Sequence, residues 1–307
     1  MWLDQPRNPK APLAGLKVLE LARVLAGPWA GQILADLGAD VIKIESPAGD
    51  GTRLWGPPWV EREEGDREAA YYHAANRGKR SVVADFKNAD DLRRVSELAA
   101  GADVVLENFK TGTLARYGLD FASLEALNPR LVYCSITGFG QTGPRASEAG
   151  YDFVIQAMSG FMALTGEPAG QPMKMGISIS DLTCGLYSVI GIQAALAMRE
   201  RTGRGQHVDM ALLDCSVGLL ASQATHYLTT GENPPRMGNE HAQVSAYGVF
   251  PVADGEVVLA PANDGLFRKL LALLGREGQE VKIAIDPFPY QTFGMVQGRV
   301  PPVSQAA

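Results

Sequence analysis

Lys17-Val-Leu-Glu-Leu-Ala22 and Asp40-Val-Ile-Lys-Ile-Glu45 are two short, mostly apolar runs, and Gly27-Pro28 begins the segment between them. The two runs are typical of buried strands, and the segment from Gly27 to about Leu37 is typical of a helix. Proline is well tolerated in the first turn of a helix, and Gly38 marks the end of this one. A strand, a helix and a second strand within about thirty residues form a βαβ unit, in which the strands pair in parallel.

The same alternation continues to about residue 140. Strands are predicted at 81–85, 103–107 and 131–136, with a helix at 88–100 and helical pieces at 113–117 and 121–127. Strands that alternate with helices predict a doubly wound, Rossmann-like α/β domain. Such sheets bind ligands at the carboxyl ends of their strands, which directs attention to Asn108-Phe109-Lys110 after the 103–107 strand.

The second part of the chain adds a long helix and then a smaller domain. Helices are predicted at 182–201, 214–230 and 265–274, and strands at 206–213, 247–252 and 257–260. A segment rich in Pro and Asn at 231–238 is typical of a linker. We therefore predict a large α/β domain at 1–230, an incomplete smaller α+β domain at 231–278 and a β-type tail at 279–307.

The composition argues against several classes of protein. The 307 residues carry a net charge of -6 without a long run of one sign, which gives no support to nucleic-acid binding. The N-terminus has no signal-peptide pattern, and the scattered Cys134, Cys184 and Cys215 fit a reduced, cytoplasmic protein without a metal site. The most apolar window, Leu182–Met198, is too short to span a bilayer, so we expect a buried helix and no membrane association.

Two carboxylates, Asp152 and Asp181, lie among small and apolar residues. An ionisable group at the mouth of a buried helix costs free energy unless it is paired or hydrogen-bonded. Asp181 could cap the helix predicted at 182–201, since Asp is a favoured N-cap residue. It could also be a nucleophile that the helix dipole holds ionised and directed outward. Asp152 could equally be a turn residue after Gly150, and the local pattern leaves these alternatives open.

The other motifs have plainer interpretations. The segment Gly138-Phe-Gly-Gln-Thr-Gly143 matches the dinucleotide fingerprint G-x-G-x-x-G and follows a strand. Pro144 and Arg145 stand where a helix of small residues is needed, so this support for nicotinamide binding is weak. Arg77, Lys79, Arg80 and Arg116 would most often be solvated cations, and the four histidines are isolated.

A series of short motifs runs through the chain in a fixed order. They are Pro12–Leu21, Ala26–Pro28, Leu37–Glu45, Asn76–Ser81, Glu107–Phe109, Gly138–Pro144, Gly150–Asp152, Thr165–Pro168, Asp181 with Gly185, and Glu200–Gln206. Through these motifs, residues 12–275 resemble the class III coenzyme A transferases, the family of formyl-CoA transferase and carnitine CoA-transferase. The resemblance is specific because many motifs occur in the right order.

The resemblance implies positions for the site residues. Asp181 occupies the position of an aspartate nucleophile, and Asp152 that of a second acidic residue that assists it. Three residues match positions that line the CoA site: Asn108, Phe109 and Arg116. Four residues would lie near the nucleotide end: Asn76, Arg77, Lys79 and Arg80.

The resemblance also implies a reaction. A carboxylate attacks an acyl-CoA thioester, gives a mixed anhydride and releases the CoA thiolate. A carboxylic acid acceptor then takes the acyl group, and CoA returns to form the new thioester. CoA and acyl-CoA are then substrates, no cofactor is permanently bound, and the family's interlocked homodimer is expected.

Three features complicate this expectation. The related 2-methylacyl-CoA racemases use a histidine where Tyr151 stands, and a phenol is a poor base at neutral pH, so transfer is favoured over racemisation. Arg23 and Leu25 replace polar active-site residues of formyl-CoA transferase, which argues against a formyl or oxalate specificity. Residues 281–307 resemble a β segment of membrane-fusion adaptor proteins, so we expect a truncated or fused chain, with an inactive CoA-binding remnant as an alternative.

Overall fold

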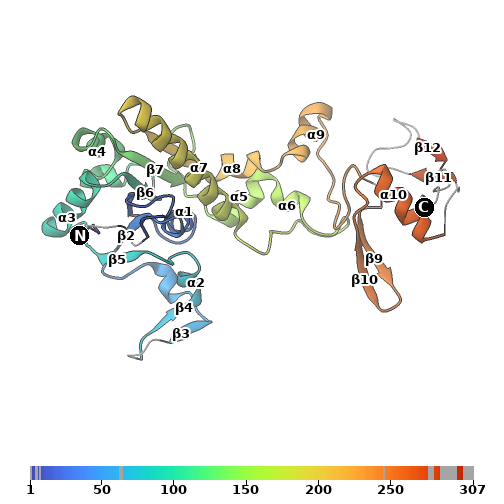
Figure 1. Cartoon of the computed structure of the whole chain (residues 1–307), viewed down its shortest axis with the longest axis horizontal. Coiled ribbons are helices and arrows are strands. Elements are labelled where there is room, and N and C mark those ends of the chain that lie inside the picture. Colours follow the sequence, from blue (N-terminus) through green and yellow to red (C-terminus); the bar gives the residue numbers. More distant parts are fainter. Residues whose placement is uncertain are drawn as a thin grey trace. The chain divides into compact units, whose positions relative to one another are not determined.

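A computed structural model of the chain describes residues 2–3, 6, 8–61, 65–244, 246–275, 280–283 and 296–299. Its main feature is a six-stranded sheet in the order β5-β2-β1-β6-β7-β8, in which all neighbouring strands pair in parallel (Figure 1). The strands are β1 Lys17–Glu20, β2 Asp40–Glu45, β5 Arg80–Val83, β6 Val104–Glu107, β7 Val132–Thr137 and β8 His207–Ala211. This is the strand order of a Rossmann-type doubly wound sheet, and the predicted fold class is confirmed.

The order of the strands reverses between β1 and β6. The chain moves outward from β1 through β2 to β5, and then returns to place β6 on the other side of β1. Ligands of open α/β sheets bind outside the carboxyl ends of the strands at such a switch point. The segments that follow Glu20 and Glu107 therefore form the expected place for a site.

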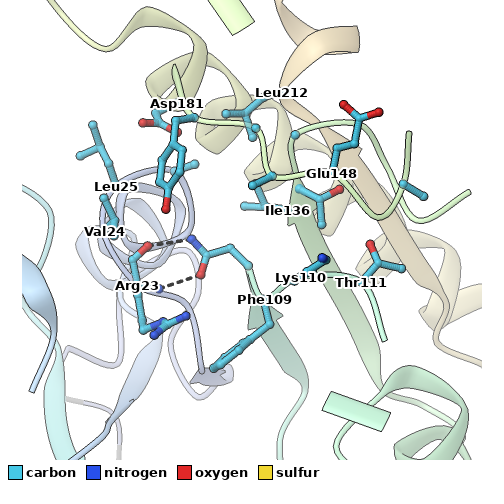
Figure 2. A pocket seen from close by; sticks show the side chains of 18 of the residues that line it. Arg23, Val24, Leu25, Phe109, Lys110, Thr111, Ile136, Glu148, Asp181 and Leu212 are labelled. Carbon is cyan, nitrogen blue, oxygen red and sulfur yellow. Dashed lines mark hydrogen bonds between the residues drawn. The ribbon is translucent and has the colours of Figure 1, made fainter. Parts of the chain in front are cut away.

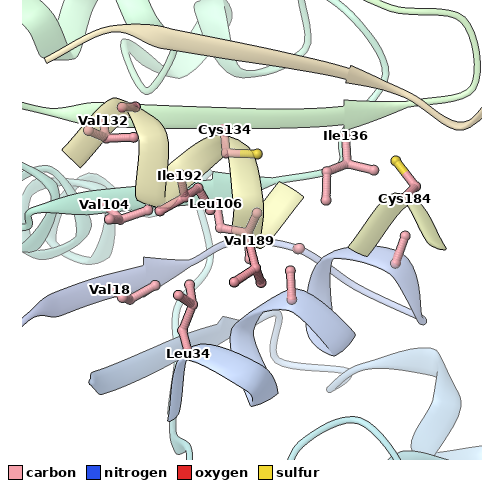
Figure 3. Packing of buried hydrophobic residues seen from close by; sticks show 14 of the residues in the cluster. Val18, Leu34, Val104, Leu106, Val132, Cys134, Ile136, Cys184, Val189 and Ile192 are labelled. Atoms are coloured by element: carbon pink, nitrogen blue, oxygen red, sulfur yellow. The ribbon is translucent and has the colours of Figure 1, made fainter. Parts of the chain in front are cut away.

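Helices cover both faces of the sheet because side chains alternate along each strand. On one face, α1 (Ala26–Asp36) and α7 (Ile179–Thr202) pack over Val18, Val104 and Val132 (Figure 3). On the other face, α3 (Ala89–Ala100) and α4 (Phe121–Leu127) pack over the residues next in sequence, such as Leu19 and Val105. Both clusters consist mainly of buried aliphatic side chains, which form the core of this domain.

The helix α7 is longer than predicted. It has 24 residues, and within the described part of the chain it is long and apolar enough to cross a membrane by length and composition alone. The prediction that this segment is too short was wrong, because the helix extends beyond the apolar window at both ends. The predicted packing in the core is confirmed, since Cys184, Val189, Ile192, Ala195 and Leu196 all belong to the buried cluster.

A glycine allows α7 to approach the beginning of α1. A Cβ atom on Gly185 would lie 2.8 Å from the carbonyl oxygen of Ala26 and 3.0 Å from Cδ1 of Trp29. Such distances are too short for a methyl group next to backbone, so any larger residue would separate the two helices. The position of α7 relative to the turn after β1 therefore depends on this glycine.

The segments between the predicted elements contain more structure than expected. The region 46–65, predicted as a loop, contains a 3₁₀ helix at Gly51–Leu54 and the strand β3 (Trp59–Glu61), which pairs antiparallel with β4 (Arg67–Ala69). Short helices that were not predicted are α2 (Ala70–His73), α5 (Asp152–Ser159) and α6 (Phe161–Leu164). The helical piece predicted at 113–117 is the 3₁₀ helix η2 (Leu114–Tyr117). The helix predicted at 214–230 is two helices, α8 (Leu212–Gly218) and α9 (Ser222–Thr230), separated at Ala221, which has a positive φ of 45°.

The chain divides into two compact units. The first comprises residues 1–161 and 175–221, and the second comprises 162–174 and 222–307. The second unit contains the antiparallel pair β9 (Gly248–Val252) and β10 (Gly255–Leu259), the helix α10 (Asp264–Leu273), and the antiparallel pair β11 (Glu280–Ile283) and β12 (Val296–Arg299). The division thus falls at residue 221, where the sequence placed it at 230, and it assigns residues 162–174 to the second unit.

Candidate active site

A cavity of about 410 Å³ opens at the carboxyl ends of β1 and β6 (Figure 2). One wall is the turn after β1, with Arg23, Val24 and Leu25, and a second wall is the loop after β6, from Asn108 to Thr111. Asp181, from the first turn of α7, also lines the cavity. The switch point of the sheet and one of the predicted catalytic carboxylates therefore share one pocket.

The side chain of Asn108 fixes the turn after β1. Its Oδ1 accepts a hydrogen bond from the Arg23 N–H at 2.8 Å, and its Nδ2 donates to the Arg23 carbonyl oxygen at 2.7 Å (Figure 2). The Arg23 guanidinium lies 4.7 Å from the centre of the Phe109 ring, in a cation–π arrangement. Asn108 and Phe109 thus line the pocket as predicted, and they hold an exposed positive charge at its edge.

Asp181 is not the residue that caps α7. The helix begins at Ile179, so Asp181 is its third residue, and Ser178 at the N-cap position forms no side-chain cap. Asp152 supplies the cap from another helix, because its Oδ1 accepts from the N–H of Ser180 at 2.8 Å and of Asp181 at 3.3 Å. The capping interpretation of Asp181 was wrong, and Asp152 has that function.

The environment of Asp181 disfavours its charged form. Burial, and to a smaller extent the negative charge of Asp152, raise the pKa of Asp181 to about 7. No cation of the described residues contributes to this shift. The expectation that the helix dipole holds Asp181 fully ionised was therefore wrong. A carboxylate that titrates near neutrality is a better nucleophile than an ordinary one, as expected of a reactive group.

Tyr71 lies near Asp181 and Asp152, although it is not among the residues that line the cavity, and it was missed from the sequence. It lies in α2, and its side chain is hydrogen-bonded to Ser178, just before α7. Burial raises the pKa of Tyr71, and the charges of Asp181 and Asp152 raise it further. The phenol therefore stays protonated beside the two carboxylates. No local pattern could have identified Tyr71, because only the fold brings α2 to the first turn of α7.

The cationic segment predicted for the nucleotide end lies elsewhere. Lys79 is buried and its Nζ lies 2.8 Å from Glu20 Oε2, whereas Arg77 pairs with Asp36 and Arg80 with Asp40. Asn76 donates to the Tyr72 carbonyl oxygen and accepts from Lys79. Arg116 is exposed in η2 and is not among the residues that line the pocket. The structure brings Asn108, Phe109 and Asp181 together but not these five, whose contact with CoA stays a prediction.

The glycine-rich segment after β7 has a packing function. The first helix after Gly143 is α5, which begins at Asp152, so the arrangement required by a dinucleotide fingerprint is absent from this described segment. A Cβ atom on Gly138 would lie 2.5 Å from the Cα atom of Gly150. The two glycines allow these backbones to touch at the wall of the pocket, which both of them line.

Comparison with known proteins fits this geometry. The sequence model of CoA-transferase family III matches residues 13–286. The chain belongs to this family. The resemblance found in the motifs is thereby confirmed, and the match extends beyond residue 275, where it was predicted to end.

Named members of CoA-transferase family III match most of the chain. It is 60% identical over 274 residues to the succinate–glutarate CoA-transferase of Agrobacterium fabrum (strain C58 / ATCC 33970), covering 89% of this chain and 68% of that protein. It is 40% identical over 296 residues to the succinyl-CoA:glutarate CoA-transferase of Homo sapiens, and the match covers 95% of this chain and 65% of that protein. The chain thus spans about two thirds of the length of these relatives.

A solved structure from the same family has the same fold. The crystal structure of a CAIB/BAIF family protein from Brucella suis superposes with a TM-score of 0.80 at 60% identity, covering 87% of this chain and 70% of that one. At this identity, side chains as well as the fold are expected to correspond.

Proposed function

We propose that this protein transfers coenzyme A from an acyl-CoA to a carboxylic acid, with Asp181 as the nucleophile. The observation that carries the proposal is that a buried carboxylate with a pKa raised to about 7 lines the pocket at the switch point of a family III sheet. Among the described residues that line the pocket, there is no cysteine or histidine that could act as the nucleophile instead. The described residues also contain no cluster that could hold a metal ion.

The first step follows from the chemistry of the two groups. An oxygen of the Asp181 carboxylate attacks the thioester carbonyl carbon, the C–S bond breaks, and the CoA thiolate leaves. The product is a mixed anhydride between Asp181 and the acyl group, which is at least as reactive toward nucleophiles as the thioester that it replaced. The acceptor carboxylate attacks the acyl carbon of this anhydride, the bond to Asp181 breaks, and an anhydride of the two acids forms. The CoA thiolate then attacks the acceptor's carbonyl carbon, which gives the new thioester and releases the donor acid. Covalent catalysis divides one exchange into easier steps.

Asp152 and Tyr71 would assist this step in different ways. Asp152 holds the first turn of α7 by accepting from two of its N–H groups, and its charge raises the pKa of Asp181. Tyr71 stays protonated, so it can donate a hydrogen bond to an oxygen that becomes negative during attack. Neither residue need take part covalently.

The pocket has features that suit a CoA thioester. Arg23 is an exposed cation at its edge and can pair with a phosphate, which is a strong, charge-assisted contact. The Phe109 ring and the apolar side chains of Val24, Leu25 and Ile136 can contact the uncharged parts of the ligand. CoA would then bind as a substrate and leave as part of the product.

The relatives indicate the class of acid. Both named relatives act on the dicarboxylic acids succinate and glutarate, according to their names, and the bacterial one is 60% identical to this chain. We infer that dicarboxylic acids are the acyl donors and acceptors here. Arg23 and Leu25 in the turn after β1 agree with a specificity other than formate.

A homodimer remains our expectation. Several apolar side chains on α5 and α7 are exposed in the single chain, including Phe153, Val154, Leu186 and Ile190, the last at 63%. An apolar surface of this kind commonly marks an interface. This supports association of two copies, and sedimentation of the purified protein would test it.

The function is tested by mixing the protein with succinyl-CoA and glutarate and following glutaryl-CoA by mass spectrometry. We expect glutaryl-CoA and free succinate to form in equal amounts. Hydrolysis of succinyl-CoA without glutaryl-CoA would contradict the proposal. Exchange of the acyl α-hydrogen for deuterium without transfer would instead support a racemase.

A further inference from the structure

Four charged side chains lie buried beneath the turn that forms one wall of the pocket. They are Glu20 at the end of β1, Lys43 in β2, Asp50 after β2 and Lys79 before β5, and none of the four side chains is more than 2% exposed. Glu20 and Lys43 face each other in the parallel register of β1 and β2. Burying four charges is costly unless each is paired, so a cluster of this kind calls for an explanation beyond packing.

Each charge in this buried cluster is matched by oppositely charged or polar partners. Lys43 Nζ lies 3.0 Å from Glu20 Oε1 and 3.1 Å from Asp50 Oδ2, and Lys79 Nζ lies 2.8 Å from Glu20 Oε2. A Cβ atom on Gly31 of α1 would lie 1.8 Å from Glu20 Oε2, so only glycine leaves room for this carboxylate. The sequence of α1 is thus adapted to the cluster.

Two members of the cluster also bind the backbone of the turn after β1. Lys43 Nζ donates to the carbonyl oxygen of Ala22 at 2.7 Å, and Asp50 Oδ2 accepts from the N–H of Val24 at 3.3 Å. Asn108 binds both backbone groups of the intervening Arg23. Side chains therefore hold every backbone polar group from the Ala22 carbonyl to the Val24 amide.

The turn that is held in this way has a strained backbone. Val24 has a φ of 68°, in the left-handed region that a β-branched residue rarely adopts. Without the contacts from Asp50 and Lys43, a valine would favour a negative φ, and the turn would move. Val24 and Leu25 line the same pocket as Asp181, so this movement would change the shape of the pocket beside the carboxylate.

We propose that Lys43 and Asp50 are positioning residues, which hold the strained turn at Val24 so that the pocket is preformed against Asp181. This proposal rests on the proposed function, because it assigns the turn a part in orienting the acyl-CoA. A misplacement of about 1 Å in a reacting group can lower a rate by roughly 100-fold, so a rigid wall is worth the cost of buried charges.

The test compares Asp50→Ala with a second substitution that relieves the strain. Asp50→Ala removes the acceptor of the Val24 amide, and we expect kcat to fall about tenfold at temperatures where the variant is folded, because a left-handed valine is disfavoured by about this factor. Glycine adopts positive φ without strain. In the double variant Asp50→Ala/Val24→Gly, kcat should therefore recover to within about threefold of Val24→Gly alone.

Thr52→Val is the matched control. It removes the hydroxyl that donates to Asp50 Oδ1 at 2.8 Å, but leaves the contact between Asp50 and Val24 in place. We expect a lower unfolding midpoint with an unchanged kcat. The proposal is wrong if Asp50→Ala keeps the kcat of the wild type, or if Val24→Gly does not restore the kcat that Asp50→Ala has lost. The cluster would then have only a structural function.

Amide hydrogen exchange in the wild-type protein provides a second readout. The Val24 amide should exchange as slowly as the amides of β1, whereas exchange within the mixing time would overturn the proposal even if Asp50→Ala does not fold. Failure of the proposed function is distinguishable, because the wild type would then form no glutaryl-CoA while the Val24 amide stayed protected.

Discussion

Two groups of charged side chains, one fully buried and one partly buried, lie in the large domain, and they are arranged in opposite ways. Glu20, Lys43, Asp50 and Lys79 alternate in sign, so each charge has a counter-charge within about 3 Å. Asp152 and Asp181 have the same sign, and the described residues place no cation among the groups that shift the pKa of Asp181. The first arrangement stabilises charge, and the second destabilises it.

The pKa values follow this difference. Burial lowers the pKa of Lys43, but the attraction of Glu20 and Asp50 outweighs burial, and the net shift is upward. Lys79 faces Glu20 and lies near the like charge of Lys43, so burial dominates and lowers its pKa to about 8. For Asp181 burial and its neighbour act in the same direction. The charges that are paired with counter-charges stabilise the fold. A carboxylate beside a pocket that has no counter-charge is available for chemistry.

The largest expected effect is that of Asp181→Asn. An amide oxygen is a poor nucleophile, so the rate of CoA transfer should fall by at least about 10³-fold. A small loss of the transfer rate would contradict the assignment of Asp181 as the nucleophile.

The same variant should be more stable at pH 8. The raised pKa means that the folded state binds a proton more tightly than the unfolded chain, so stability falls as the pH rises from about 4 to 7. Asparagine carries no charge, so the folded variant does not bear the cost of a buried carboxylate at pH 8. We expect the free energy of unfolding at pH 8 to rise by about 1–2 kcal/mol, less than the full shift because the pocket admits water. Urea unfolding at pH 5 and pH 8 measures it, and an equal difference at both pH values would contradict this explanation.

Removal of a charge from the paired cluster should change the free energy of unfolding in the opposite direction. Lys43→Met leaves Glu20 and Asp50 buried without their shared cation, and the free energy of unfolding should fall by about 3–5 kcal/mol. Arg77→Met is the matched control, because Arg77 pairs with Asp36 at the exposed surface and such pairs contribute little. Urea unfolding of both variants measures the difference between a buried and an exposed ion pair, and equal midpoints would contradict it.

The contact between α7 and α1 can be tested by a single methyl group. Gly185→Ala places a Cβ atom against Ala26 and Trp29, and should lower the free energy of unfolding by about 1–3 kcal/mol. In Gly218→Ala the new methyl group meets open space at the end of α8. Thermal unfolding should show no loss for this control, and a similar loss in both variants would rule out the steric explanation.

The smallest expected effect is a shift in a pH profile. Asp152→Asn removes one negative charge, so the lower midpoint of kcat/KM against pH should move toward lower pH. The midpoint should remain above that of an ordinary aspartate, because burial is the larger cause of the shift. Glu148→Gln removes another carboxylate of the same pocket that does not contribute to this pKa, and it should leave the midpoint in place.

Much of the fold could be predicted because periodicity and turn residues act locally. The runs at 17–22 and 40–45 predicted the bounds of β1 and β2 to within two residues, and Gly27-Pro28 predicted the beginning of α1 to within one residue. The short helices α2 and α5 were missed, since a few residues give too little periodicity to detect.

The site could be predicted only in part. Asp181, Asn108 and Phe109 were identified by their motifs, and the fold brings them to one pocket. Lys43 was read simply as part of a strand, because nothing in Asp40–Glu45 shows that Glu20 and Asp50 surround its amine. The functions of Asp152 as a cap and of Val24 as a strained residue also depend on contacts between distant segments, which no local pattern contains.

The proposed mechanism requires Asp181 to form a mixed anhydride with the acyl group of its substrate. Its most direct test is to mix the protein with succinyl-CoA, add hydroxylamine, and map the digested protein by mass spectrometry. We predict a hydroxamate at Asp181 that requires succinyl-CoA and is absent from Asp181→Asn. An unmodified Asp181 in a protein that exchanges CoA at its full rate would contradict this mechanism.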